Sequence, residues 1–147
     1  MSWKGDLLKA GILSDGNNIN LIRGRVQYDD ADISRDVETC AIVALDDENA
    51  TATVDQLLNS RVFKMTPTAN RTFTTPTAAA IITGLGDYAV GSNFLVTIVN
   101  LASATYTITM TAGTNVTVVG SAVVDAATSG TFRVIVTSST AVSVVRI

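Results

Sequence analysis

The sequence contains no histidine, one cysteine and two prolines, and only 16% of its residues are charged. Without histidine, the chain lacks the side chain that most often serves as a general base in catalytic triads and as a zinc ligand. Cys40 has no second cysteine with which to form an internal disulfide, and we expect it to be a buried core thiol. We therefore expect no enzyme, no metal site and no cofactor.

Carboxylates cluster at residues 29–36 and 46–48. Paired carboxylates can bind calcium or act on a glycosidic bond. The spacing does not match an EF-hand loop, and the chain has too few aromatic residues to line a sugar-binding cleft. Solvated turns are therefore the simpler interpretation, and a small hydrolase that uses these carboxylates is the least favoured alternative.

Charge is unevenly distributed along the chain. Residues 1–64 hold 18 of the 23 charged side chains, including every lysine. This contrast predicts an N-terminal arm over 1–64 and a Thr/Val/Ala-rich body over 65–147. The net charge of −3 argues against nucleic acid as a partner, and no apolar run is long enough to span a membrane. No signal peptide is visible, so we expect synthesis in a cytoplasm.

The arm combines short strand-like segments with apolar side chains near its start. Residues 19–28 are strand-like, with a bend at Gly24, and residues 39–45 have the pattern of a buried strand. Charged segments with apolar anchors can become ordered when they dock on a partner. The candidate anchors are Trp3, Leu7, Leu8, Ile12 and Leu13.

The body alternates apolar and polar residues with period two after Gly91, and turn residues separate the alternating runs. Short strands at this spacing predict an all-β fold, an antiparallel β-sandwich or jelly-roll-like body. One short helix is expected between Thr75 and Gly84, where Thr75 can cap the first turn, Pro76 suits the first helical position and Gly84 suits the end.

Several predicted strands are apolar on both faces, whereas a monomeric sandwich normally has a polar outer face. We interpret the excess as a subunit interface, although single apolar residues scattered on a surface are also common. The candidate interface residues are Leu95, Val99, Val119, Ile135, Val145 and Ile147. Alternating threonines at Thr105–Thr111 form a hydroxyl-bearing face, which suits either carbohydrate binding or an uncharged, protease-resistant surface.

Four segments of the body carry a resemblance to a known module: Thr68–Ile81, Val90–Asn100, Tyr106–Gly120 and Gly130–Thr137. Their order, R-T-F-T-x-P, V-G-S-x-F, A-G-T-N-V-T and G-T-F-R-V, resembles a β-sandwich module of bacteriophage and virus head-decoration (cement) or fibre proteins. The resemblance covers roughly Thr68 to Ile147, and the first 60 residues match no module.

The resemblance implies a homotrimer displayed on the exterior of a virion, without catalytic residues. We therefore expect a structural protein that decorates a capsid, binds the major capsid protein through its arm and stabilises the head. The alternative is a receptor- or glycan-binding module of a tail or head fibre. We expect neither nucleic acid nor membrane as a partner.

Overall fold

The computed structural model describes residues 19–22, 25–28, 40–86 and 88–147. The chain divides into two units, Met1–Thr39 and Cys40–Ile147. In the first unit, β1 (Ile19–Ile22) pairs antiparallel with β2 (Arg25–Tyr28), so the segment expected to be one bent strand forms two. The predicted anchors Trp3, Leu7, Leu8, Ile12 and Leu13 lie outside the described residues.

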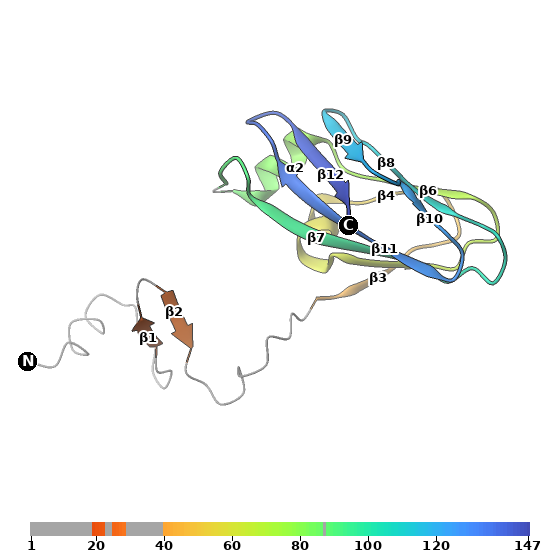
Figure 1. Cartoon of the computed structure of the whole chain (residues 1–147), viewed down its shortest axis with the longest axis horizontal. Helices are drawn as coiled ribbons and strands as arrows, with labels where there is room; N and C mark the ends of the chain where they lie inside the picture. The colour runs from red at the N-terminus through yellow and green to blue at the C-terminus, as the bar shows by residue number, and fades with distance from the viewer. Residues whose placement is uncertain (1–18, 23–24, 29–39, 87) are drawn as a thin grey trace, which may run out of the picture. The chain divides into compact units, whose positions relative to one another are not determined.

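The second unit is strand-rich and contains two mixed sheets, which confirms the mostly-β prediction (Figure 1). The six-stranded sheet contains, in spatial order, β3 (Ile42–Ala44), β5 (Val62–Met65), β7 (Asn93–Asn100), β11 (Thr128–Val136), β12 (Val142–Arg146) and β9 (Val116–Val119). The four-stranded sheet contains β10 (Val123–Val124), β8 (Ile108–Thr111), β6 (Arg71–Thr74) and β4 (Ala50–Thr51).

The antiparallel prediction is wrong for much of this unit. Among the described residues of 40–147, five strand pairings are parallel and three are antiparallel. From β3 to β11 the chain visits the two sheets alternately. Strands β3, β5 and β7 are parallel to one another, as are β4, β6 and β8, because each returns to its sheet by way of the other sheet. Strands β10 and β11 depart from this pattern, since β10 pairs antiparallel with β8 and β11 with β7. Up to β11, the turn residues between runs therefore join different sheets, whereas β11 and β12 form a hairpin within one sheet.

One core cluster contains side chains from both sheets. Phe63 of β5 and Phe73 of β6 are fully buried, and their ring centroids are 4.7 Å apart. Aromatic pairs at this separation gain more than their buried area alone would give. The alternation predicted for the body is confirmed in β7 and β11, where Val96, Ile98 and Val134 have their side chains in the core.

Two short helical segments lie between strands. The predicted helix exists as α2 (Ala78–Leu85), but its cap is Thr77, whose hydroxyl accepts a hydrogen bond from the Ala80 amide. Gly84 is inside the helix, and Gly86, with φ of 67°, follows its end. Thr75 instead accepts a hydrogen bond from the Gly113 amide. The other segment, η1 (Gln56–Ser60), begins with reciprocal bonds between Thr53 and Gln56, a capping box.

The compact unit begins at Cys40, whereas the charge distribution placed the division at residue 64/65. Strands β3, β4 and β5 belong to the two sheets, and Met65 is buried in the core. Charge density failed as a guide because loop residues such as Asp46, Asp47 and Glu48 carry charge within the folded unit, whereas β3 and β4 carry none. Cys40 is half-buried rather than buried, since it precedes the edge strand β3.

Candidate interaction surface

The six-stranded sheet has a second face that does not contribute to the core. Alternate residues of a strand point to opposite faces, and neighbours in register share a face. Because Val96, Val134 and Val144 lie in the core, their neighbours along the strands lie on the opposite side. We call that side the outer face. One of its rows runs across four strands as Leu95, Arg133, Val145 and Val119.

All six candidate interface residues lie on this outer face, or continue it beyond the end of β12. They come from four strands that are far apart in sequence, and the register brings them together. Leu95, Val119 and Ile147 are 45%, 46% and 64% exposed. Val99, Ile135 and Val145 are half-buried. Their role in an interface stays a prediction.

Sequence reasoning missed two residues of the same face, Ile42 and Val62. Ile42 is 60% exposed, and the register places it beside Val62, which in turn lies beside Thr97. Both had been assigned to the arm. The signal that could have found them is the short apolar run around each residue, which resembles the strand runs of the body.

The charged side chains of the outer face are Lys64 and Arg133, both exposed, and no carboxylate is present on it among the described residues. Arg133 lies between Leu95 and Val145, and Lys64 lies beside Val99. The Arg133 guanidinium donates to the side-chain oxygen of Asn93 at 3.4 Å. The outer face thus combines exposed apolar side chains with two positive charges and with uncharged polar residues such as Thr97 and Thr131.

A shallow depression adjoins the outer face where β7 ends. Its volume is about 490 Å³, and its lining includes Val99, Leu101 and Ser129. Leu101 is 50% exposed. The apolar surface therefore continues past the sheet into a concave region.

The four-stranded sheet has a very different outer surface. Its threonines lie side by side in register, Thr72 beside Thr109 and Thr74 beside Thr111, with Thr51 beside Thr74. The adjacent Phe73, Ile108 and Met110 are buried. Of the predicted threonine row, Thr105 and Thr107 precede β8 and lie outside the sheet. We call this surface the threonine face.

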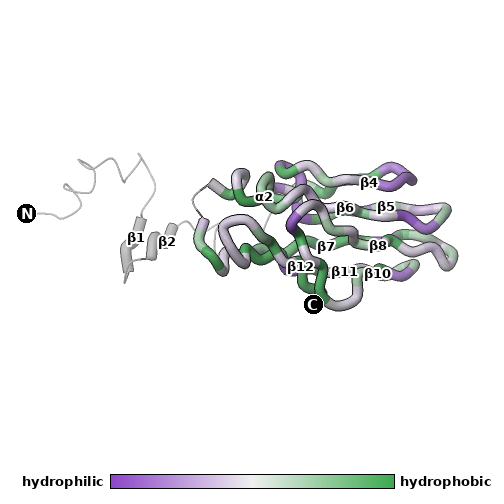
Figure 2. The backbone as a smooth tube through the Cα atoms, turned by 90° about the horizontal axis from the view of Figure 1, so that it is seen from above, coloured by the Kyte–Doolittle hydropathy of each residue, from purple (hydrophilic) through white to green (hydrophobic). Residues whose placement is uncertain are grey.

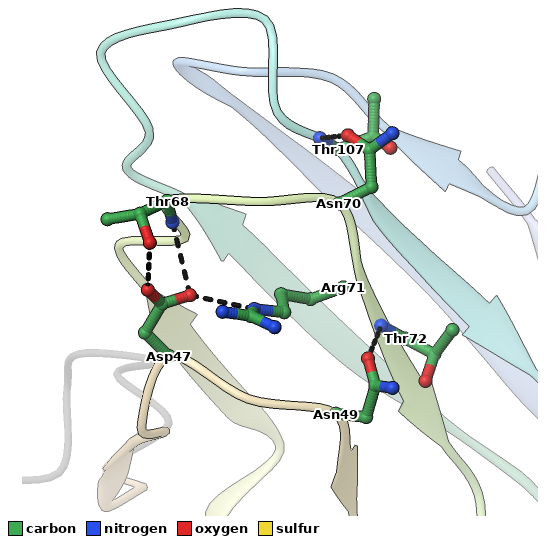
Figure 3. Close-up of polar contacts among 7 residues, drawn as sticks. All are labelled: Asp47, Asn49, Thr68, Asn70, Arg71, Thr72 and Thr107. Carbon is green, nitrogen blue, oxygen red and sulfur yellow. Dashed lines mark hydrogen bonds and ion pairs between the residues drawn. The ribbon is translucent and has the colours of Figure 1, made fainter.

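The loops at one end of the second unit are joined by polar side chains (Figure 3). The Asp47 carboxylate accepts hydrogen bonds from the amide and hydroxyl of Thr68 and, at 2.8 Å, from Arg71 Nε. Donation from Arg71, and then from Thr68, holds the pKa of Asp47 well below its ordinary value. Figure 2 shows hydrophilic colour at the loop tips beside β4, β5 and β10.

Two asparagines extend the parallel pairing beyond the strands. The side-chain oxygen of Asn49 accepts from the Thr72 amide at 3.0 Å, and that of Asn70 accepts from the Thr107 amide at 3.1 Å. In each case the donor is the residue that the strand register places beside the asparagine. These contacts fix the loops that precede β4, β6 and β8 to one another.

Comparison with protein-family models, with curated proteins and with solved structures gave no match to this chain. Within the described residues, no group of three metal-ligating side chains of the His, Cys, Asp and Glu types comes together. No helix in the described ranges has the length and apolarity needed to cross a membrane. The outer face is therefore the strongest candidate site in the described part of the chain.

Proposed function

We propose that this chain is a structural, non-enzymatic protein of a virion that decorates the capsid exterior as a homotrimer. Its second unit is a β-sandwich whose outer face is buried between subunits. Its N-terminal arm binds the major capsid protein and thereby stabilises the head. Each subunit of the trimer contacts the capsid lattice weakly. The overall binding is strong because the linked contacts act together.

The observation that carries this proposal is the set of exposed apolar side chains on the outer face. Soluble monomers rarely expose large contiguous apolar patches, and such patches mark interaction sites. Exposed Leu95, Val119 and Ile42 lie in one face together with half-buried Val99 and Val145. A subunit interface removes this area from water, which favours association.

The test of the arm is binding to particles. Virus particles that carry the chain would be purified and stripped of it. They would then be incubated with the full-length protein or with the double variant Trp3→Ala, Leu8→Ala. We expect the variant to lose most of its binding and to keep the circular dichroism of the parent protein. The matched control is Lys4→Ala with Lys9→Ala, which changes the same segment but keeps its apolar anchors.

Two results count against this function. Equal occupancy by the anchor variant would exclude these side chains as the attachment, and absence of the full-length chain from purified particles would contradict the virion role.

The threonine face favours a second candidate, a receptor- or glycan-binding module of a tail or head fibre. Rows of hydroxyls on a flat sheet can exchange hydrogen bonds with sugar hydroxyls. A glycan array would show saturable binding that is lost in Thr72→Val with Thr109→Val and kept in Leu95→Ser. Absence of binding to any glycan leaves the decoration role as the better explanation.

A further inference from the structure

The two cations of the outer face constrain what can cover it. Lys64 and Arg133 both lie among apolar neighbours, and neither has a carboxylate partner within the described residues. Arg71 and Asp47 form an ion pair, but it lies in the loop cluster and not on the outer face. Burying an unpaired cation is strongly unfavourable, so the covering surface has to supply carboxylates together with apolar side chains.

This requirement excludes contact between two outer faces. A two-fold arrangement would bring the Lys64 and Arg133 of one copy against a surface with the same positive charges and no carboxylate. Neighbours in a closed ring of three instead meet through two different patches, because each interface is heterologous. The outer face is one patch, and a different segment of the chain has to be the other.

Segment 29–38 of the sequence has the required composition. It contains five carboxylates, one arginine, and the apolar residues Ile33 and Val37. The carboxylates of the segment are Asp29, Asp30, Asp32, Asp36 and Glu38. The other acidic run, residues 46–48, has its central carboxylate occupied by Arg71 and Thr68.

We infer that the outer face of one subunit binds the acidic segment 29–38 of a second copy of this chain. The apolar side chains of the segment cover Leu95, Val99 and Val145, and its carboxylates neutralise Lys64 and Arg133. This inference rests on the proposed homotrimer and names the two surfaces that form its interface. Opposite charges at such contacts also select the partner and its register.

The experiment exchanges charges in the full-length protein. One variant carries Lys64→Glu with Arg133→Glu, a second carries Asp30→Lys with Asp32→Lys, and a third combines all four substitutions. Each reversed pair alone should raise the concentration for half-assembly by about tenfold or more, as measured by sedimentation. The combined variant should return to within about threefold of the parent protein, because opposite charges again face each other.

A control and three results decide the outcome. Thr111→Glu adds a negative charge to the threonine face and should leave assembly unchanged. If reversal of the face disrupts assembly but reversal of the segment does not, the inference is overturned while the proposed trimer stands. Failure of the combined variant to recover likewise overturns the pairing. A parent protein that is monomeric at all concentrations overturns both the inference and the proposed trimer. Binding of the arm to virus particles is a different claim, and the anchor variant tests it separately.

Discussion

At the scale of single residues, Asn100 shows how this fold tolerates a polar side chain in its interior. Asn100 has no exposed surface. Its amide nitrogen donates to the carbonyl oxygens of Tyr106 and Val124, at 2.9 and 3.0 Å, and its oxygen accepts from the Ala102 amide at 3.0 Å. Asn100 therefore bonds three backbone groups, and it fixes the loop between β7 and β8 to β10.

Replacing Asn100 with alanine should destabilise the second unit strongly. The substitution leaves three backbone groups without their partner, and unsatisfied buried groups of this kind together lower the free energy of unfolding by roughly 2–4 kcal/mol. Urea denaturation followed by circular dichroism measures this difference. Asn59→Ala, which changes an exposed asparagine, is the control and should shift the midpoint little. Equal stability of both variants would show that water replaces the Asn100 amide.

Asp47 makes a prediction that depends on pH. Because its folded-state pKa lies below the ordinary value of 3.8, Asp47 stabilises the loop contacts at higher pH and loses this effect as pH falls through the folded value. Asp47→Asn should therefore speed amide exchange at Thr68 at neutral pH. The difference from the parent protein should narrow as the solution is acidified below about pH 4, from the unfolded-state pKa toward the lower folded-state pKa. A difference independent of pH would contradict a charged carboxylate at this contact.

At the scale of elements, the alternation of strands between two sheets determines which residues approach closely. Gly113 lies between β8 and β9, against the backbone before α2. A methyl group at this position would lie 2.5 Å from the Pro76 carbonyl oxygen and 2.6 Å from that of Thr75. Glycine is required here by close backbone approach, since Gly113 also donates to Thr75.

Gly113→Ala should accordingly destabilise the protein, by about 1–3 kcal/mol if the surrounding backbone shifts to relieve the overlap. Thermal unfolding measures the effect, with Ala112→Ser at the exposed neighbouring position as the control. An unchanged melting temperature would mean that β8 and α2 are not packed as closely as the structure has them.

The sequence predicts elements of this fold better than it predicts their connections. Period-two alternation located β7, β8, β11 and β12, because burial of one face imposes that pattern on any strand. Alternation is the same in parallel and antiparallel strands, so it did not reveal that the chain changes sheet at nearly every turn. The caps show a similar limit, because the sequence predicts Thr75 as the cap and only the position of Gly113 reveals that Thr75 has another partner and that Thr77 caps the helix.

The outer face was predictable in part for the same reason. Leu95 and Val145 stand out because each follows the alternation of a long strand and is apolar where a polar residue is expected. Ile42 and Val62 do not, because β3 and β5 are short and lie among charged residues. The positions of Lys64 and Arg133 within that face follow from register, which no local pattern specifies.

At the scale of the whole molecule, the two sheets present surfaces of opposite character. The outer face carries exposed apolar side chains and two cations among threonines and serines, whereas the threonine face is uncharged at Thr51, Thr74 and Thr111. This asymmetry suits a subunit with one side toward its neighbours and one toward water. Both edge strands of the six-stranded sheet, β3 and β9, also lack charged residues, although free-standing edges are usually protected by them.

Substitutions on the two surfaces should therefore have unequal effects on assembly. Leu95→Asp with Val119→Asp places carboxylates in the apolar area and should weaken self-association by about tenfold or more. Thr74→Asp with Thr111→Asp makes the same change on the threonine face and should leave association intact. Sedimentation of both variants at matched concentrations compares them, and equal weakening would show that net charge rather than the outer face controls assembly.

The claim that the outer face is a subunit interface is tested most directly by the mass of the full-length protein in solution. Light scattering after size separation measures this mass over a wide range of concentrations. If the outer face is covered by other copies, the mass is three times the 15.4 kDa of one chain and falls only on high dilution. A well-behaved species of 15.4 kDa at every concentration would contradict the claim that this face is a subunit interface.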